Sequence, residues 1–185
     1  MFIDSDYIKE YFTNSTDPTK EGYWRPRYLD DPSSENLKEY DTIVEEINDN
    51  DSVVDVGCGY HPFKGRIRNL IGIDKYNQAA DVVIDMLDYN EGPFDVVIAL
   101  GATNLFSFEL IDKQIEKLVS LCKPGGKIYM RVNPGLEKIV TPKLNFCSWT
   151  LQHIGDYTIK HNLEIIKPIE LTRNLRYIWL WQKQK

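Results

Sequence analysis

Short, largely apolar runs recur along the chain from residue 52 onward and predict the strands of a sheet. Turns or helical patterns separate these runs. Strands that are apolar on both faces are typical of a parallel sheet that helices cover on each side, so the pattern indicates an α/β fold. The seven expected strands are 52–56, 70–73, 81–84, 94–100, 127–132, 163–170 and 175–182.

Three segments carry apolar residues at the three- and four-residue spacing of a helix with one buried face. The first follows the Pro-Ser-Ser sequence at 32–34, a typical helix start, and ends near residue 47. The second begins at the candidate cap Ser107 and stops at the Lys-Pro-Gly-Gly sequence of 123–126. The third is expected over residues 146–161, with an inner side made of Cys147, Leu151, Ile154 and Thr158.

The link between the last two strands fixes the direction of the final one. Only residues 171–174 separate these strands. A parallel crossover needs a dozen residues or more, whereas so short a link joins antiparallel neighbours. The sequence therefore predicts a three-layer α/β fold whose seven-stranded mixed sheet has an antiparallel last strand.

Composition and charge narrow the class of protein. The chain has 185 residues, of which 42% are hydrophobic, enough for one folded core. Its net charge of −6 provides no overall attraction to nucleic acid or anionic lipid, and no apolar run approaches the ~20 residues of a membrane helix. The first residues do not form a signal peptide pattern, and three widely spaced cysteines suit neither a disulfide framework nor a zinc site. We expect a cytoplasmic protein without a metal.

Acidic residues and a glycine turn follow three of the expected strands. Asp55 and the turn containing Gly57 and Gly59 end the first strand, and Asp74 and Asp85 end the second and third. The carboxyl ends of parallel strands lie at one edge of the sheet, where glycines allow a ligand to approach the backbone and a carboxylate can accept ribose hydroxyl protons. Together these groups predict a nucleoside site.

Five segments at strands and turns stand out together. They are Val53-Val54-Asp55-Val56-Gly57-Cys58-Gly59, Ile73-Asp74, Ile84-Asp85, Phe94-Asp95-Val96-Val97-Ile98 and Leu121-Cys122-Lys123-Pro124-Gly125-Gly126. Together they resemble a compact class I S-adenosylmethionine-dependent methyltransferase, which implies a Rossmann-like fold. The resemblance covers about residues 51–185 and includes the antiparallel last strand. A nicotinamide-binding motif would require a third glycine where this chain has Pro62, which argues against a dehydrogenase.

The resemblance implies S-adenosylmethionine as the cofactor and places its methionine and ribose parts. The turn of Gly57, Cys58 and Gly59 would lie against the methionine part. Asp55 would help to hold the amino group of the cofactor, directly or through water. Asp74 would bind the ribose.

The same resemblance places the adenine and the methyl group. Asp85 and Met86 would meet the adenine, and Lys75 is also expected to contact the cofactor. The backbone from Leu100 and Gly101 to Asn104, after the fourth strand, would line the side of the pocket that carries the transferable methyl.

The chain divides into an N-terminal helical and aromatic cap segment, residues 1–50, and a methyltransferase core, residues 51–185. The connection 75–80 is too short for the helix usually found there in the family. The adenine side is therefore expected to be open, or to be covered by residues 1–50. The segment is also expected to cap the acceptor pocket.

No catalytic triad is required, because the sulfonium of such a cofactor already makes its methyl electrophilic. The catalytic residues stay undetermined by the sequence, with His61, Asn104 and Arg131 as candidates. His61 is the best-placed base just after the glycine turn. The alternative is a loop histidine that fixes the turn before Pro62.

The methyl acceptor is expected to be a small molecule, such as a nucleotide or a sugar-like metabolite. One alternative is an RNA methyltransferase that recruits RNA through Arg25 and Arg27, and another is a regulatory module that binds the cofactor without turnover. A DNA methyltransferase is disfavoured because residues 101–104 lack the Pro-Pro motif of amino-methylating enzymes. The sequence does not determine the oligomeric state.

Overall fold

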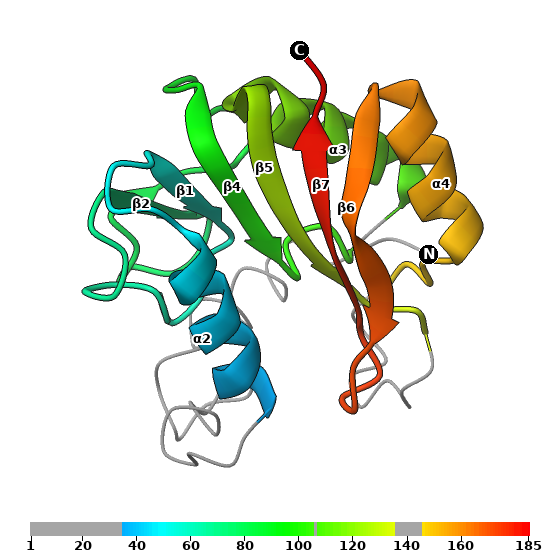
Figure 1. Ribbon diagram of the computed structural model, residues 1–185, viewed down its shortest axis with the longest axis horizontal. Coiled ribbons are helices and arrows are strands. Elements are labelled where there is room, and N and C mark those ends of the chain that lie inside the picture. Colours follow the sequence, from blue (N-terminus) through cyan, green and yellow to red (C-terminus); the bar gives the residue numbers. More distant parts are fainter. Residues whose placement is uncertain (1–34, 106, 136–145) are drawn as a thin grey trace.

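Seven strands form one mixed sheet in the order β3-β2-β1-β4-β5-β7-β6 (Figure 1). The structure is a computed structural model that describes residues 35–105, 107–135 and 146–185. Strands β1 to β5 run parallel to one another, and β7 runs antiparallel to both of its neighbours, β5 and β6. The strands are β1 (Val53–Val56), β2 (Leu70–Asp74), β3 (Val82–Val83), β4 (Phe94–Leu100), β5 (Cys122–Val132), β6 (Leu163–Leu171) and β7 (Tyr177–Lys183).

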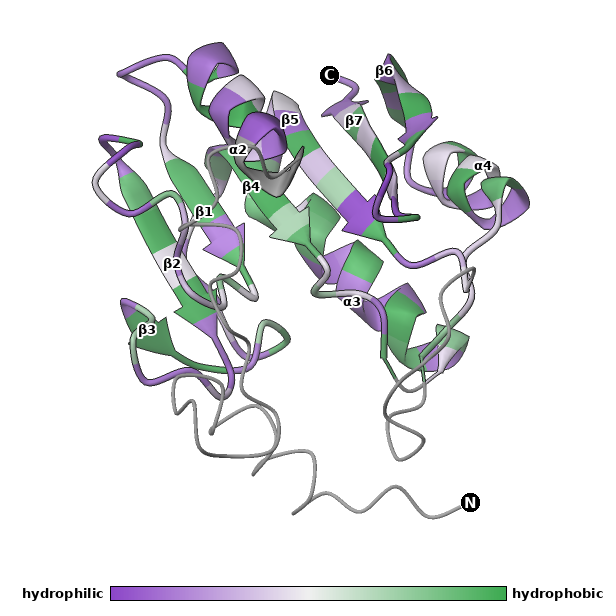
Figure 2. Cartoon of the chain, turned by 90° about the horizontal axis from the view of Figure 1, so that it is seen from below, coloured by the Kyte–Doolittle hydropathy of each residue, from purple (hydrophilic) through white to green (hydrophobic). Residues whose placement is uncertain are grey.

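Within the described residues, three helices cover the two faces of the sheet. Helix α2 (Glu35–Glu46) lies on one face, and α3 (Phe108–Leu121) and α4 (Leu151–Lys160) lie on the other (Figure 2). The larger hydrophobic cluster fills the space between the sheet and α3 and α4, and a smaller one lies under α2 around Ile43. The fold predicted from the strand pattern, with the reversed last strand, is confirmed.

Helix α3 begins where its cap was expected. The Ser107 hydroxyl accepts a hydrogen bond from the amide of Leu110, which satisfies one of the unpaired N–H groups at a helix start. Its buried residues recur at the spacing of one helical face, as a stripe pressed against the sheet requires. They are Ile111, Ile115, Leu118 and Leu121.

Helix α4 is shorter than expected. It begins at Leu151 rather than at 146, because Thr150 and His153 form reciprocal capping hydrogen bonds. The residues before it are not helical, and among them Trp149 is buried. The expectation that Leu151 lies on the inner side of the helix is wrong, since Leu151 is 55% exposed.

Turns rather than helices connect β1 to β2, over residues 57–69, and β2 to β3, over residues 75–81. His61 covers this part of the sheet, because its ring lies against Gly72 of β2 with no room for a side chain there. Its Nε2 is 2.6 Å from Oδ2 of Asp81, and the Gly72 amide donates to the same oxygen. His61 thus connects the turn after β1 to the start of β3.

Residues 1–34, most of the predicted cap segment, lie outside the described residues, and the boundary at residue 50 stays a prediction. Helix α2, at the end of that segment, belongs to the fold. Tyr129 of β5 donates a hydrogen bond to Glu46 at 2.8 Å, and Lys167 of β6 pairs with the same carboxylate. No helix within the described residues is long and apolar enough to cross a membrane.

The contact between His61 and Gly72 leads to a stability prediction. Gly72→Ala would place a methyl group in the space of the imidazole, so we expect a loss of about 1–3 kcal/mol in the free energy of unfolding, the usual cost of overpacking. Urea unfolding measures it. Gly155→Ala is the matched control, because an added Cβ meets nothing there, and it should stabilise α4 by about 0.5–1 kcal/mol. Equal effects of the two alanines would contradict the packing described.

Candidate functional site

The glycine turn lies against the carboxyl end of β2. The amides of Gly57 and Cys58 both donate to the carbonyl oxygen of Ile73, at 2.8 and 3.1 Å. These two amides therefore already have a hydrogen-bond acceptor within the protein. The turn can provide space for a ligand, but these two amides cannot bind an anion without breaking that contact.

Asp74 is the centre of the site. Its Oδ2 accepts a hydrogen bond from the Gly59 amide at 3.1 Å, and its Oδ1 accepts from the amides of Tyr76 and Asn77 at 2.8 and 2.9 Å. A carboxylate has about four lone-pair positions, so about one stays free for a ligand. The turn and this carboxylate come together as the sequence predicted, but Asp74 has room for one ribose hydroxyl rather than two.

Gly57 brings the glycine turn against the loop that follows β4. Its φ of +67° favours glycine, and an added Cβ would lie 2.9 Å from the Cβ of Ala102. Gly101 also has a positive φ, of +110°, so the chain bends sharply after Leu100. This close approach gives the expected methyl side of the site a wall of backbone and small side chains.

Asp55 is a buried carboxylate with an unpartnered oxygen. It is 3% exposed, and its Oδ2 accepts no hydrogen bond from the described residues. Burial, and then the nearby charge of Asp74, raise the pKa of Asp55 to about 8, against a smaller opposite effect of Arg131. A cationic ligand group would relieve this situation, because it would supply the missing partner.

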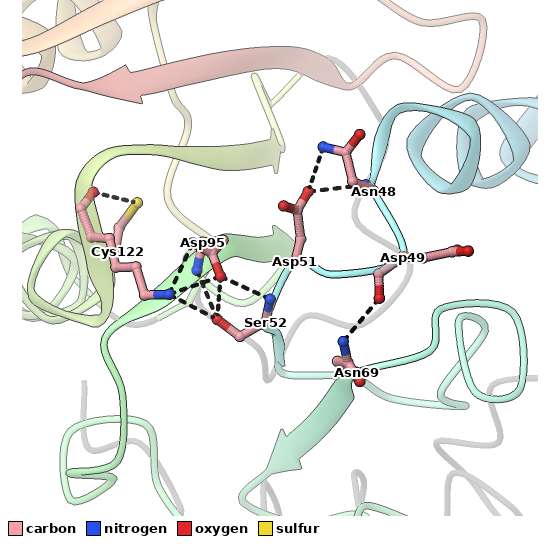
Figure 3. Close-up of polar contacts among 8 residues, drawn as sticks. Asn48, Asp49, Asp51, Ser52, Asn69, Asp95 and Cys122 are labelled. Carbon is pink, nitrogen blue, oxygen red and sulfur yellow. Dashed lines mark hydrogen bonds and ion pairs between the residues drawn. The ribbon is translucent and has the colours of Figure 1, made fainter.

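At the amino ends of the parallel strands, the carboxylates already have hydrogen-bond partners within the protein (Figure 3). Asp95 accepts hydrogen bonds from the Ser52 hydroxyl at 2.6 Å and from the Lys123 ammonium at 2.8 Å. These partners, Lys123 first, lower the pKa of Asp95 to about 2. At the carboxyl ends of the strands, by contrast, Asp55 keeps an oxygen without a partner among the described residues.

Asp85 lies on the adenine side of the expected site and pairs with Lys75. Its Oδ2 is 2.8 Å from the Lys75 ammonium, and its Oδ1 accepts from the Leu87 amide at 3.0 Å. Partial burial acts to raise the pKa of Asp85, but these two contacts outweigh it and hold the pKa below its usual range. Met86 packs against the larger core cluster.

Cys58 is buried next to these carboxylates. Burial, followed by the charges of Asp55, Asp74 and Asp81, raises the pKa of its thiol far above the usual range. The thiolate is the nucleophilic form of cysteine, so Cys58 does not serve as a nucleophile here.

The three catalytic candidates are all engaged by other residues. His61 is held between Gly72 and Asp81. Asn104 accepts from the Asn133 amide at 2.8 Å and donates to the Gly101 carbonyl at 3.2 Å, so it joins the loops after β4 and β5. These contacts favour a structural role for both side chains.

Arg131 is held on the α2 face of the sheet. It pairs with Glu39 at 2.9 Å and lies over the ring of Tyr40, and both ionic side chains are largely buried. Its Nη2 also donates to the Leu100 carbonyl at 3.5 Å. Arg131 thus joins α2 to the strand end that borders the site.

A cavity of about 450 Å³ lies beside His61 and is lined mainly by residues 64–70. Two of its cations are already paired with acids, Lys64 with Asp81 at 2.7 Å and Arg66 with Asp41 at 2.5 Å. Its other charged lining residues, Arg68 and Asp49, have opposite signs, so the cavity has little net charge with which to select an ion. Within the described ranges, no group of three or more His, Cys, Asp or Glu side chains could hold a metal.

One residue at the site was missed from the sequence. Asn77 donates from its side chain to the Gly59 carbonyl. The spacing of Asn77 three residues after Asp74, in a segment rich in turn residues, was a signal for such a hydrogen-bonded loop. Ala102, which meets the glycine turn, lies within the segment 100–104 that the sequence analysis placed beside the pocket.

Comparisons with solved structures place this arrangement in a known fold. Magnesium protoporphyrin IX methyltransferase from Synechocystis PCC 6803, solved with bound S-adenosylmethionine, is similar with a TM-score of 0.68 and 17% identity, over 95% of this chain and 97% of that one. The chain has the fold of S-adenosylmethionine-dependent methyltransferases. No family model and no curated protein matches the sequence.

Two further structures with the methyltransferase fold are similar over most of the chain. The amino pentose methyltransferase CalS10 from Micromonospora echinaspora has a TM-score of 0.59 and 12% identity, over 81% of this chain and 91% of that one. The N-methyltransferase NodS from Bradyrhizobium japonicum WM9 has the same TM-score and identity, over 83% and 99%. At these identities the likeness establishes the fold, and the roles of the ten expected cofactor residues stay predictions.

The burial of Asp55 predicts how stability changes with pH. The folded protein keeps this carboxyl protonated up to about pH 8, whereas the unfolded chain releases the proton near pH 4. The contribution of Asp55 to stability is therefore present at low pH and declines between these values, by up to about 1.4 kcal/mol per pH unit. Urea unfolding from pH 5 to pH 8 should show a shallower decline for Asp55→Asn than for the native chain.

The control for this experiment is Asp88→Asn, which changes an exposed carboxylate in a turn. Its unfolding free energy should follow the native pH dependence. Parallel curves for Asp55→Asn and the native chain would contradict the buried, protonated state of Asp55.

Proposed function

We propose that the protein is an S-adenosylmethionine-dependent methyltransferase that acts on a small-molecule acceptor. The observation that carries the proposal is the meeting of the glycine turn with the Asp74 carboxylate, beside the unpartnered buried oxygen of Asp55. This combination offers a place for an amino group next to a place for a ribose hydroxyl. The fold and the position of these groups at the carboxyl ends of β1 and β2 support the same assignment.

The residues fit the methionine and ribose parts of the cofactor. Asp55 would accept the α-ammonium, which supplies the partner that its Oδ2 lacks. Gly57, Cys58 and Gly59 would face the methionine chain. Asp74 would accept one ribose hydroxyl with its remaining lone pair.

The adenine and methyl sides are assigned to neighbouring residues. Asp85 and Met86 would meet the adenine, and Lys75 would leave or share Asp85 when the adenine amino group arrives. The backbone of Leu100 and Gly101 would border the reacting methyl, where the sharp bend at Gly101 keeps side chains away.

The chain contributes alignment rather than acid–base chemistry. The cofactor supplies an electrophilic methyl group, so the protein has to hold an acceptor atom in line with it and exclude water. Asn104 and Arg131 support this by fixing the ends of β4 and β5 around the site. His61 has a structural role, because its ring packs against Gly72 and its Nε2 contacts Asp81.

A small-molecule acceptor is supported by two similar proteins whose names give small molecules, magnesium protoporphyrin IX and an amino pentose. The acidic chain agrees with it, since a net charge of −6 gives no general affinity for nucleic acid. Residues 1–50 are proposed to cap the acceptor pocket.

Calorimetry with S-adenosylmethionine tests the cofactor site. The native protein should bind, and Asp74→Asn should raise the dissociation constant by about 10- to 100-fold, the range expected when a hydrogen bond to a charged group is lost. Asp88→Asn, in the exposed turn after β3, should bind like the native protein. Absence of binding by the native chain would overturn the proposed function, and unchanged affinity of Asp74→Asn would remove Asp74 from the site.

Transfer of a labelled methyl group tests the acceptor class. Tritiated cofactor is supplied to a cell extract with the native protein or with Asp74→Asn, before and after nuclease treatment. Label should enter small molecules only with the native protein. Label in a nuclease-sensitive product would instead indicate RNA, and cofactor binding without any transfer would indicate a regulatory module.

A further inference from the structure

The glycine turn of this chain is not held by a helix. In doubly wound folds the glycine-rich turn after the first strand leads into a helix, whose first turn fixes the backbone near the ligand. Here residues 57–69 form turns throughout. Some other contact has to hold the turn in one conformation if it is to bind a ligand.

The loop after β2 provides that contact at Gly59. Gly59 has a φ of +52°, and its amide donates to Asp74. Its carbonyl oxygen accepts a hydrogen bond from the side-chain amide of Asn77. Both polar backbone groups of Gly59 are therefore fixed by residues that lie three positions apart in the next loop.

Asn77 is suited to this task because its own position is fixed. It is only 4% exposed, its backbone amide donates to Asp74 Oδ1 at 2.9 Å, and its side-chain oxygen accepts from the Ala79 amide at 2.8 Å. A buried amide whose oxygen and nitrogen both have partners holds a single orientation.

We propose that Asn77 is a positioning residue for cofactor binding: its side chain holds Gly59 in the conformation that receives the methionine part of the cofactor, in place of the missing helix. The inference rests on the proposed function. It assigns to Asn77 a role that the sequence analysis did not give it.

Asn77→Ala separates this role from that of Asp74. The substitution removes the two side-chain hydrogen bonds, to Gly59 and from Ala79, and leaves the backbone amides that hold Asp74. The affinity for S-adenosylhomocysteine, which has a methionine-like part, should fall about tenfold, as for the loss of one buried hydrogen bond. The affinity for 5′-methylthioadenosine, which lacks the amino-acid part, should fall less than threefold.

Asn77→Ser keeps part of the local structure. Its hydroxyl can still accept a hydrogen bond from the Ala79 amide, as serine does in such turns, but it is too short to reach Gly59. It should lose affinity for S-adenosylhomocysteine as the alanine variant does, with a smaller loss of thermal stability. This variant decides the question if Asn77→Ala does not fold.

Asn69→Ala is the matched control. The Asn69 side chain donates to a carbonyl oxygen of another loop, that of Asp49, at 2.9 Å (Figure 3). Asn69 directly precedes the amino end of β2, whereas Gly59 lies at the carboxyl ends of the strands. Its loss can lower stability but should leave the affinities for both nucleosides, and their ratio, at the native values.

The binding of S-adenosylhomocysteine and 5′-methylthioadenosine is measured by calorimetry, at a temperature where every variant is folded. A larger loss for S-adenosylhomocysteine supports the proposal. Native affinities in both Asn77 variants, or equal losses for the two ligands, would overturn it. A native protein that binds neither ligand overturns the proposed function itself, and this is measured first.

Discussion

The charge of Asp74 is the constraint around which the site is built. A carboxylate at a half-buried strand end has to be compensated by polar partners, and here three backbone amides supply that compensation. The amides come from both loops that meet at this edge, so one charge sets the conformation of Gly59 and of the chain after β2. The shape of the site follows from this interaction more than from any helix.

On the face of the sheet that α2 covers, side chains bury parts of the strands that no helix covers within the described residues. Only α2 covers this side of the sheet within the described residues, and the smaller hydrophobic cluster lies beneath it. The His61 ring covers Gly72, and Asp81 holds the ring while accepting from the Gly72 amide. Gly72, His61 and Asp81 thereby bury this part of β2 without a helix.

The sequence predicted the sheet well because hydrophobic runs report burial directly. Residues 94–100 are apolar on both faces, and the strand has the same bounds. The start of β5 was missed, since the sequence Lys-Pro-Gly-Gly at 123–126 is typical of a loop, although Cys122 pairs with Phe94 across a register shift. The residues around a strand end do not indicate which distant strand it pairs with, so this start could not be predicted.

At the candidate site, the sequence predicted which residues lie at the strand ends, but not which hydrogen bonds their polar atoms make within the protein. Parallel strand ends share an edge, so the meeting of the glycine turn with Asp74 could be anticipated. A structural role for His61 was one of the two interpretations of the sequence, but its partner could not be predicted, because Asp81 lies twenty residues further along the chain. The amides of Gly57 and Cys58 bond to Ile73, and the Asp74 carboxylate accepts from the same turn, so a phosphate would meet repulsion without donors. A cationic nucleoside, such as the proposed S-adenosylmethionine, would meet neither problem, because its ammonium would find an acceptor in Asp55 and its ribose would need only an acceptor.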